Sequence, residues 1–272
     1  MSAPAEAGAS NGVAWYVYGV VEGGAEAPAD AGIEVSTVTA GPVSALVSRV
    51  PLDEYGEEAV QARLQDPAWL AGAAHAHEAV LEAALRSGAV VPFRLLTVFR
   101  DGDELRRFLS TRGDDLRAVL DRVRGKVEVG VKAFVDRSVL DEAVAADSPA
   151  LRELDAEIAS AQIGRAYLLG RRREQALEEA AVRRTLELAT ALHARLRDAA
   201  EDGVANPVQS REASGRAEEM VLNGAYLVPG GDDRFARELD ALGEEHRLVG
   251  VTFERTGPWP PYNFVPRELG AA

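Results

Sequence analysis

The first half of the chain opens with apolar runs that predict strands. Residues 13–21 are dense in β-branched and aromatic side chains and are apolar on both alternating faces, which is typical of a buried strand. Two shorter runs follow at residues 33–40 and 42–50. The Gly41-Pro42 pair between them favours a turn, so these two runs predict a hairpin.

Helical spacing follows the hairpin. Asp66 and Pro67 form an N-cap and first-position pair, and an apolar stripe at helical spacing then runs to Gly88, where the predicted helix ends. Residues 89–99 predict a further strand, with Pro92 at an edge or a bulge. Another amphipathic helix begins at Asp101. Together these patterns predict an N-terminal α+β domain over residues 13–124.

The second half begins with strict alternation over residues 126–135, which predicts a half-buried strand. A helical tract then covers about residues 149–202, with an interruption near Gly164. Charged residues fill the faces that the leucines leave free. We therefore expect this tract to form an extended helical arm, an antiparallel hairpin resembling a coiled coil.

Two strands, a helix and a last strand complete this half. Residues 204–211 contain Pro207, which suits an edge strand, whereas residues 217–228 are apolar on both sides and suit a central strand. A helix starts at Asp232 or Asp233, and a strand covers residues 246–256. The order β-α-β-β-α-β predicts a ferredoxin-like C-terminal domain over residues 125–272. The fold class is thus α+β with two domains.

Composition and charge narrow the function. The chain has 272 residues and a net charge of -14, which argues against binding nucleic acid or an anionic membrane surface. It contains no cysteine and no apolar run long enough for a transmembrane helix. Residues 1–12 lack a signal-peptide pattern and are small and polar, so we expect them to be disordered. These features predict a cytoplasmic protein.

No catalytic or cofactor-binding motif is present. His75 and His77 point to different sides of one helix and cannot bind the same ion from it, and His77 shares the apolar stripe, which predicts a core histidine. There is no nucleophile elbow, phosphate loop or dinucleotide fingerprint. Arg171–Arg173 lie close to Glu174 and Glu178, which predicts an ion-paired helix surface. We expect no catalytic residue, metal ligand or cofactor.

The C-terminal tail, residues 256–265, combines prolines with aromatic residues. Each proline restricts the residue before it to extended geometry, so the segment is stiff before it binds anything. One interpretation is that the tail folds back and completes the core; the other is that it docks on a partner protein. The candidate partner-binding residues are Pro258, Trp259, Pro260, Tyr262 and Phe264.

Five stretches occur in an order that resembles one known family. They are "WYVYGVV" from Trp15, "VVPFRLLTVF" from Val90, "GRAYLLGRRREQAL" from Gly164, "EEMVLNGAYLVP" from Glu218 and "GPWPPYNFV" from Gly257. Together they resemble the gas vesicle protein GvpF/GvpL family over nearly the whole chain. Leu95-Leu96 departs from the pattern, because many members carry an aromatic-Gly pair there.

The resemblance implies an accessory, non-enzymatic protein of gas vesicle assembly. It implies binding to the hydrophobic shell protein and to other gas vesicle accessory proteins, and a location at gas vesicles in the cytoplasm. It also implies two α+β domains, the second ferredoxin-like with a coiled-coil element, and it carries over no catalytic residue. The alternative is a ferredoxin-like small-molecule-binding or regulatory module with a pocket.

Overall fold

The computed structural model describes residues 12–269, which form two compact units. Within the described residues, the first unit comprises residues 12–128 together with residues 259–269, and the second comprises Val129–Pro258. The sequence patterns place the boundary at 124/125 and the tail in the C-terminal domain. The tail from Trp259 onward instead belongs to the first unit, because its side chains pack into the core of that unit. The disorder expected for residues 1–12 falls almost wholly outside the described residues.

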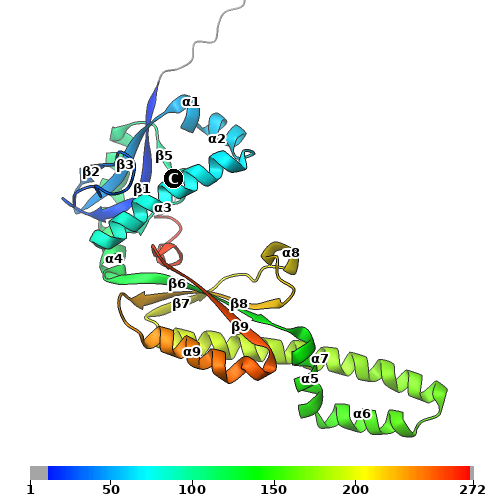
Figure 1. Ribbon diagram of the computed structural model, residues 1–272. Helices are drawn as coiled ribbons and strands as arrows, with labels where there is room; N and C mark the ends of the chain where they lie inside the picture. Colours follow the sequence, from blue (N-terminus) through cyan, green and yellow to red (C-terminus); the bar gives the residue numbers. More distant parts are fainter. Residues whose placement is uncertain (1–11, 270–272) are drawn as a thin grey trace, which may run out of the picture. The chain divides into compact units, whose positions relative to one another are not determined.

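The first unit is built on a five-stranded sheet with the order β2-β3-β1-β4, in which β5 also pairs with β1 (Figure 1). Helix α4 packs on β1, β2 and β3, and α3 packs on β1. The elements are β1 (Val13–Glu22), β2 (Ser36–Ala40), β3 (Val43–Pro51), α1 (Leu52–Tyr55), α2 (Glu57–Arg63), α3 (Pro67–Ser87), β4 (Val91–Pro92), β5 (Val98–Phe99), α4 (Gly102–Val123) and the 3-10 turn η2 (Tyr262–Phe264).

The helix-capping predictions in this unit are confirmed. The Asp66 carboxylate accepts hydrogen bonds from the backbone N–H groups of Ala68 and Trp69, and α3 ends at Gly88. In the same way Asp101 accepts from Asp103 and Glu104 at the start of α4. These caps satisfy backbone donors that a helix end leaves free. The short helices α1 and α2 lack a long apolar stripe, and the sequence patterns did not predict them.

The single strand expected over residues 89–99 is wrong. It divides into β4 and β5, both antiparallel to β1. Leu96, between them, has a φ of 66°, a left-handed backbone conformation that interrupts an extended strand. The backbone still bonds to β1 on either side of the break, through Phe93 N–H to the Tyr18 carbonyl and Val17 N–H to the Thr97 carbonyl.

The second unit is built on a four-stranded sheet with the order β7-β8-β6-β9. Helices α7 and α9 lie on the same face of this sheet (Figure 1). The elements are β6 (Lys126–Val135), α5 (Arg137–Asp147), α6 (Pro149–Ser160), α7 (Ile163–Ala199), β7 (Asp202–Ala205), α8 (Arg211–Ser214), β8 (Glu219–Pro229), α9 (Arg234–His246), the 3-10 turn η1 (Arg247–Val249) and β9 (Val251–Trp259).

The central place predicted for residues 217–228 is confirmed by β8, whereas the edge strand predicted over residues 204–211 is largely wrong, because β7 covers Asp202–Ala205 and shares only two residues with it. The apolar strand β8 is central and β7 is at an edge. β7 ends at Ala205, so Pro207 lies just beyond it, where no ladder hydrogen bond is lost. β9 begins later than expected, after the turn η1, and extends to Trp259. The first residues of the expected stiff tail are therefore part of a strand.

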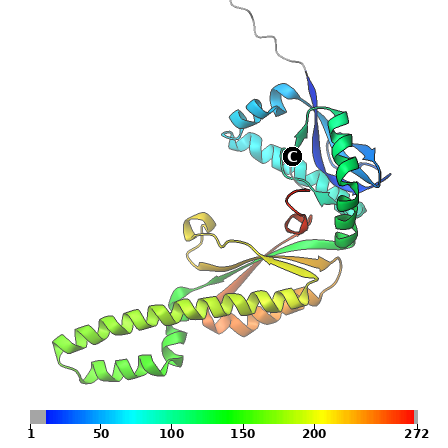
Figure 2. The ribbon, with the colours of Figure 1, turned by 180° about the vertical axis from the view of Figure 1, so that it is seen from behind.

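The helical tract predicted over about residues 149–202 is confirmed by α6 and α7, which cover residues 149–199 and are interrupted close to Gly164. Helix α5 precedes the tract and was not predicted. The break between α6 and α7 is at Ala161 and Gln162. α6 and α7 lie side by side and run in opposite directions (Figures 1 and 2). An apolar seam joins them, formed by the buried side chains of Leu151, Leu154 and Leu169. We call α6 and α7 the arm.

Candidate partner-binding surfaces

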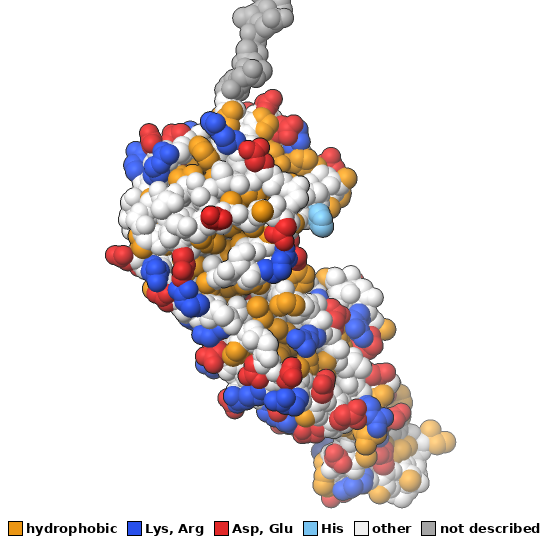
Figure 3. Space-filling view, turned by 60° about the vertical axis from the view of Figure 1, so that its left-hand side comes forward, with side chains coloured by type: hydrophobic (Ala, Val, Ile, Leu, Met, Phe, Trp, Pro, Cys, Tyr) orange, Lys and Arg blue, Asp and Glu red, His pale blue; other side chains and the backbone are white. Residues whose placement is uncertain are grey.

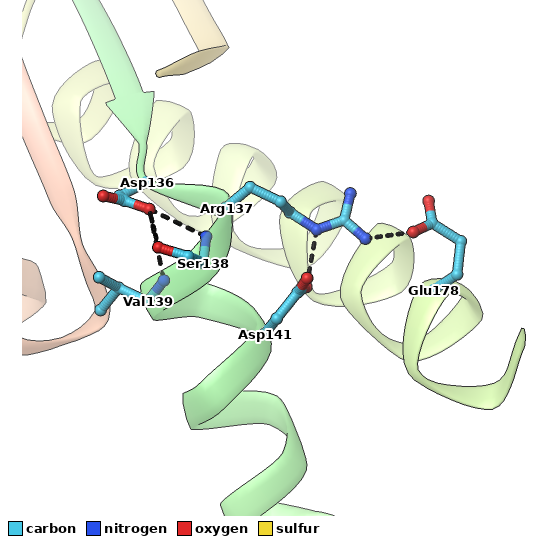
Figure 4. A network of polar contacts seen from close by, with 6 residues as sticks. All are labelled: Asp136, Arg137, Ser138, Val139, Asp141 and Glu178. Atoms are coloured by element: carbon cyan, nitrogen blue, oxygen red, sulfur yellow. Dashed lines mark hydrogen bonds and ion pairs between the residues drawn. The ribbon is translucent and has the colours of Figure 1, made fainter. Parts of the chain in front are cut away.

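The root of the arm is fixed where β6 passes into α5. Asp136 follows the strand, and its carboxylate accepts hydrogen bonds from the backbone N–H groups of Ser138 and Val139 and from the Ser138 hydroxyl (Figure 4). These donors hold the pKa of Asp136 below its ordinary value. A charged carboxylate at a helix N-terminus is also favoured by the helix dipole, so α5 starts at a defined residue.

Arg137 connects α5 to α7. Its Nε donates to Asp141 Oδ1 at 2.7 Å, one helical turn along α5, and its second amino group donates to Glu178 Oε2 on α7 at 2.5 Å (Figure 4). Hydrogen bonding to Asp141 raises the pKa of Arg137, so the guanidinium remains charged. This bridge joins the start of α5 to the middle of α7.

Further along the arm, ion pairs add to the apolar seam. Arg173 on α7 pairs with Asp155 on α6, and Arg165 lies 3.6 Å from Glu157. Arg171 pairs with Glu174 at 3.1 Å on its own helix. The prediction of an ion-paired surface is thus confirmed for Arg171 and Arg173. For Arg172 no ion pair occurs among the described residues.

The start of α7 exposes large apolar side chains. Ile163 is 92% exposed, Tyr167 69% and Leu168 68%. They lie within two turns of one another, directly after the break between α6 and α7. Clusters of exposed apolar side chains lower the solubility of a protein, and in soluble proteins they often mark interaction sites. We call Ile163, Tyr167 and Leu168 the tip cluster.

The sequence patterns did not single out the tip cluster. The stretch "GRAYLLG" contains Tyr167, Leu168 and Leu169 in succession, and only Leu169 is buried. Adjacent residues on a helix point about 100° apart, so three consecutive apolar residues cannot all face one seam. That succession was the available signal for an exposed apolar surface.

The terminal segment of the chain is held by two carboxylates of the first unit. The Tyr262 hydroxyl donates to Glu78 Oε1 on α3 at 2.7 Å. Asn263 donates twice to Glu128 on β6, from its backbone N–H at 2.8 Å and from its side-chain amide at 2.6 Å. Burial raises the pKa of Glu128 and of Tyr262 above their ordinary values. The segment is therefore fastened by hydrogen bonds as well as by apolar packing.

The candidate residues of the tail have different degrees of exposure. Phe264 is 3% exposed, Pro260 is buried and Tyr262 is half-buried against the core of the first unit. Pro258 is exposed, and Trp259 is 37% exposed. The core-completing interpretation of the tail therefore describes Pro260, Tyr262 and Phe264. Among the five candidates, Pro258 and Trp259 have the most exposed surface.

His77 is a core residue, as its place in the apolar stripe predicts. Its Nε2 lies 3.1 Å from the Phe93 carbonyl, which only accepts, so Nε2 carries the proton. Its Nδ1 then accepts from the Tyr16 hydroxyl at 2.9 Å, and that hydroxyl accepts from the Leu96 N–H. Burial lowers the pKa of His77 to about 4. The imidazole is neutral and joins α3, β1 and the break between β4 and β5.

The described residues contain no group of three or more histidine, aspartate or glutamate side chains placed to hold a metal ion. Within residues 12–269, no helix has the length and apolar character needed to cross a membrane. Acidic and basic side chains are interspersed on the face shown in Figure 3, with apolar side chains between them. Such a surface offers contacts to proteins rather than one strong field of a single sign.

Comparison with known proteins identifies the family. The sequence model described as "Gas vesicle synthesis protein GvpL/GvpF" matches residues 14–266. The chain belongs to the GvpL/GvpF family. This is a family of gas vesicle accessory proteins and not a known enzyme family. The matched residues extend from β1 to just beyond the Tyr262–Phe264 turn.

Curated relatives carry both names of the GvpL/GvpF family. Gas vesicle protein L of Streptomyces sp. (strain CB03234) is 34% identical over 225 residues, which is 82% of this chain and 80% of that protein. Gas vesicle protein L1 of Halobacterium salinarum is 29% identical over 196 residues, 70% of this chain and 69% of that protein. Gas vesicle protein F of the same Streptomyces strain is 31% identical over 196 residues, 70% of this chain and 76% of that protein.

Solved structures of this family share the fold. The gas vesicle protein GvpF from Anabaena sp. PCC7120 aligns with a TM-score of 0.65 and 16% identity, covering 92% of this chain and 97% of that one. GvpF from Microcystis aeruginosa aligns with a TM-score of 0.61 and 18% identity, covering 92% of this chain and 98% of that one. The α+β architecture with two sheets therefore belongs to the GvpL/GvpF family.

Proposed function

We propose that this chain is a non-enzymatic accessory protein of gas vesicle assembly, and that it binds the hydrophobic shell protein and other accessory subunits while vesicles form. Membership of the GvpL/GvpF family supports the process. The tip cluster supports the mode of action, because it gathers three exposed large apolar side chains within two turns at the start of α7. It is the observation on which the proposal depends.

The proposed mechanism follows from the different solubilities of the hydrophobic shell protein and of this acidic chain. A shell subunit that is very hydrophobic exposes apolar surface before it is assembled. A chain with a net charge of -14 keeps a complex in solution through the repulsion between like-charged complexes. The tip cluster supplies Ile163, Tyr167 and Leu168 as apolar contacts, and Tyr167 adds a hydroxyl that tolerates water at the rim. Binding of this kind needs no reaction.

The architecture proposed for the second unit is ferredoxin-like, with the arm as an insertion between its first two strands. The strand order β7-β8-β6-β9 and the sequence of elements β-α-β-β-α-β support this assignment. We propose a coiled-coil character for the arm, supported by the apolar seam of Leu151, Leu154 and Leu169. The arm then presents the tip cluster away from the residues that pack on the sheet.

Pro258 and Trp259 form a proposed second contact. Trp259 is a large aromatic side chain with part of its surface open, which suits a partner contact. Phe264 cannot be tested in the same way, because it is buried and its truncation would damage the core of the first unit. Trp259→Ala alone is therefore the informative change in the tail.

A binding experiment tests the proposal. The full chain is co-expressed with the shell subunit and recovered by an affinity tag, and the shell protein recovered is quantified. We expect Ile163→Ser, Tyr167→Ser and Leu168→Ser together to reduce recovery at least about tenfold. Matched changes at Val208 and Leu248, exposed apolar residues elsewhere in the second unit, serve as controls. Equal recovery with the tip variant would contradict the proposed surface.

The alternative of a small-molecule module finds less support. A cavity of about 190 Å³ in the first unit is lined by Val21, Leu46 and Ala84 and by the paired side chains of Glu22 and Arg124. Ligand sites for metabolites are usually about 300–1,000 Å³, so this cavity is small for one. A second hollow of the first unit, of about 440 Å³, is open and lacks apolar walls, because none of its lining residues is buried: Leu52, Asp53, Gly56, Glu57, Glu58, Ala59 and Arg100. The charged groups of Glu22 and Arg124, which would be needed to orient a ligand, already form an ion pair with each other. We therefore place the function of the chain on its surfaces.

A further inference from the structure

One segment of the second unit lies over the face of the sheet that α7 and α9 leave free. It comprises residues 206–218 and includes the short helix α8, which is on the other side of the sheet from α7 and α9 (Figures 1 and 2). None of its residues is buried. A segment that buries no side chain has little apolar packing to hold it in place, and such segments open at low cost. We call residues 206–218 the strap.

Hydrogen bonds join the strap to the sheet mainly at its first residues. The Asn206 N–H donates to the Asn223 carbonyl at 2.7 Å, and the Asn223 side-chain amide donates to the Pro207 carbonyl at 2.9 Å. The Gln209 N–H then lies 3.3 Å from the sulfur of Met220, which is a weak acceptor. Among the described residues, the other hydrogen bonds of α8 and its cap are within the strap.

Arg216, near the end of the strap, makes its contact with the face of the sheet. Its guanidinium carbon lies 4.1 Å from the centre of the Phe134 ring, and Phe134 on β6 is 1% exposed. The guanidinium also donates to Glu218, within the strap, at 3.1 Å and lies 3.7 Å from Glu254 on β9. A cation over an aromatic face is attracted by the ring electrons. Arg216 therefore closes the strap on one aromatic ring and one carboxylate of the sheet.

No charge loses its last partner when the strap lifts. Arg216 keeps Glu218, which moves with it, and Glu254 keeps Lys132, whose Nζ is 3.7 Å away. Exposed ion pairs contribute little to stability, so separating Arg216 from Glu254 is not costly. Lifting uncovers the Phe134 ring beside the Glu254 carboxylate. The closed and open forms are therefore close in free energy.

An aromatic face beside a carboxylate suits a guanidinium group. The planar guanidinium stacks on the ring and hydrogen-bonds the carboxylate at the same time, which the compact ammonium of lysine does less well. We propose that Phe134 and Glu254 form an arginine-binding site covered by the strap, and that an arginine on an extended segment of a partner protein replaces Arg216 there. Two copies of a chain with a net charge of -14 repel each other, which favours a different protein as the occupant.

A distance measurement tests the strap, and it involves no residue of the tip cluster. The chain contains no cysteine, so Ala213→Cys on α8 and Thr252→Cys on β9, both at exposed positions, accept nitroxide labels specifically. Double electron-electron resonance then reports the distance between strap and sheet. We expect Arg216→Ala to broaden the distribution toward longer distances, because the contact with Phe134 is lost. Arg211→Ala, the same change elsewhere in the strap, should leave it unaltered. An unaltered distribution in Arg216→Ala would overturn the proposal.

A peptide tests the arginine site directly. The probe has the sequence of residues 206–218 and a fluorescent label, and its binding to the full chain is followed by anisotropy. We expect it to bind the Arg216→Ala chain at least about tenfold more tightly than the unaltered chain, whose own strap competes at high effective concentration. Phe134→Leu added to Arg216→Ala should abolish binding. Phe253→Leu, the same change at a half-buried phenylalanine of β9, should preserve it, with circular dichroism verifying each fold.

A second peptide with Arg216→Lys separates recognition of a guanidinium from attraction of any positive charge. It should bind the Arg216→Ala chain about tenfold more weakly than the arginine peptide. Equal binding of the two peptides would overturn the proposal. So would self-association of the unaltered chain in sedimentation that Arg216→Ala abolishes, because the strap of a second copy would then occupy the site.

Discussion

Asn263 donates two hydrogen bonds to the carboxylate of Glu128, one to each oxygen, from its backbone at 2.8 Å and its side chain at 2.6 Å. Glu128 is 5% exposed, and no other acceptor of the described chain hydrogen-bonds these two donors. The pair joins the end of the chain to β6, across 135 residues of sequence. A buried carboxylate is tolerated here because both of its oxygens are satisfied.

Glu128→Gln should destabilise the first unit although the side chain keeps its shape. The neutral amide keeps both hydrogen bonds only when the Asn263 side chain flips so that its oxygen accepts, and both bonds are then weaker than bonds to a carboxylate, so we expect a loss of about 1 kcal/mol. Urea unfolding followed by tyrosine and tryptophan fluorescence measures the loss. Asn263→Ala is the matched change and should cost a similar amount, because the backbone N–H remains bonded but Glu128 Oε1 loses its donor. A Glu128→Gln protein as stable as the unaltered chain would show that the charge of Glu128 does not strengthen its hydrogen bonds to Asn263 enough to stabilise the fold.

His77 predicts a pH dependence of stability. Its pKa is about 4 in the folded chain, against 6.5 for an ordinary histidine, so the unfolded chain binds more protons between these values. Stability should therefore fall as the pH is lowered from about 6.5 to about 4, by an amount on the order of 3 kcal/mol. Urea titrations at several pH values measure this fall.

The control for His77 is His77→Gln, which removes the titrating group. Glu128 acts in the opposite sense, because burial raises its pKa and the folded chain then holds that proton more tightly as the pH falls. This contribution is common to the unaltered chain and to His77→Gln. The difference between their slopes thus isolates His77, and identical slopes would mean that the histidine does not titrate as its burial requires.

Leu96 allows a test of backbone strain. It has a φ of 66°, and its side chain packs partly on the core of the first unit. Leu96→Ala and Leu96→Gly both remove that packing, but only glycine adopts the left-handed conformation without cost. Leu96→Gly should be more stable than Leu96→Ala by about 1 kcal/mol. If alanine is the more stable of the two in urea unfolding, the conformation at residue 96 differs from the one described.

Leu168 and Leu169 are neighbours on α7 with opposite environments. Leu169 is 9% exposed in the seam of the arm, whereas Leu168 is 68% exposed. Leu169→Ala should destabilise the arm by about 2 kcal/mol, and Leu168→Ala should change its stability by less than about 0.5 kcal/mol. Hydrogen exchange of the α6 amides reports the stability of the arm separately from the sheets. Equal effects of the two changes would place both side chains in the same environment.

The elements that the sequence predicted are those with a local physical signature. The alternation of residues 126–135, the Asp66 and Asp101 caps and the apolar stripe that contains His77 depend on neighbours within a few residues. The α+β class was predicted on the same basis, whereas the family was predicted from the resemblance of five stretches to a known family. Helix α5 was missed because it is short and has a single buried residue, Leu140.

The remaining features depend on contacts that are distant in sequence. Glu78 and Glu128 hydrogen-bond Tyr262 and Asn263 of the tail, although they lie far before them in the sequence. The sequence of the tail alone gives no means of predicting these two partners. The break at Leu96 reflects a backbone conformation that leucine rarely adopts. The tip cluster was missed for a different reason, because exposure depends on which side of α7 the seam with α6 occupies.

The most direct measurement of the central claim is complementation in a vesicle-forming host from which this gene has been deleted. Vesicles are counted by electron microscopy after expression of the unaltered chain or of the variant with Ile163→Ser, Tyr167→Ser and Leu168→Ser, at matched protein levels. We predict that the unaltered chain restores vesicles and that the variant, although folded, does not. Full restoration by the variant would contradict the claim that the chain acts in assembly through the exposed start of α7.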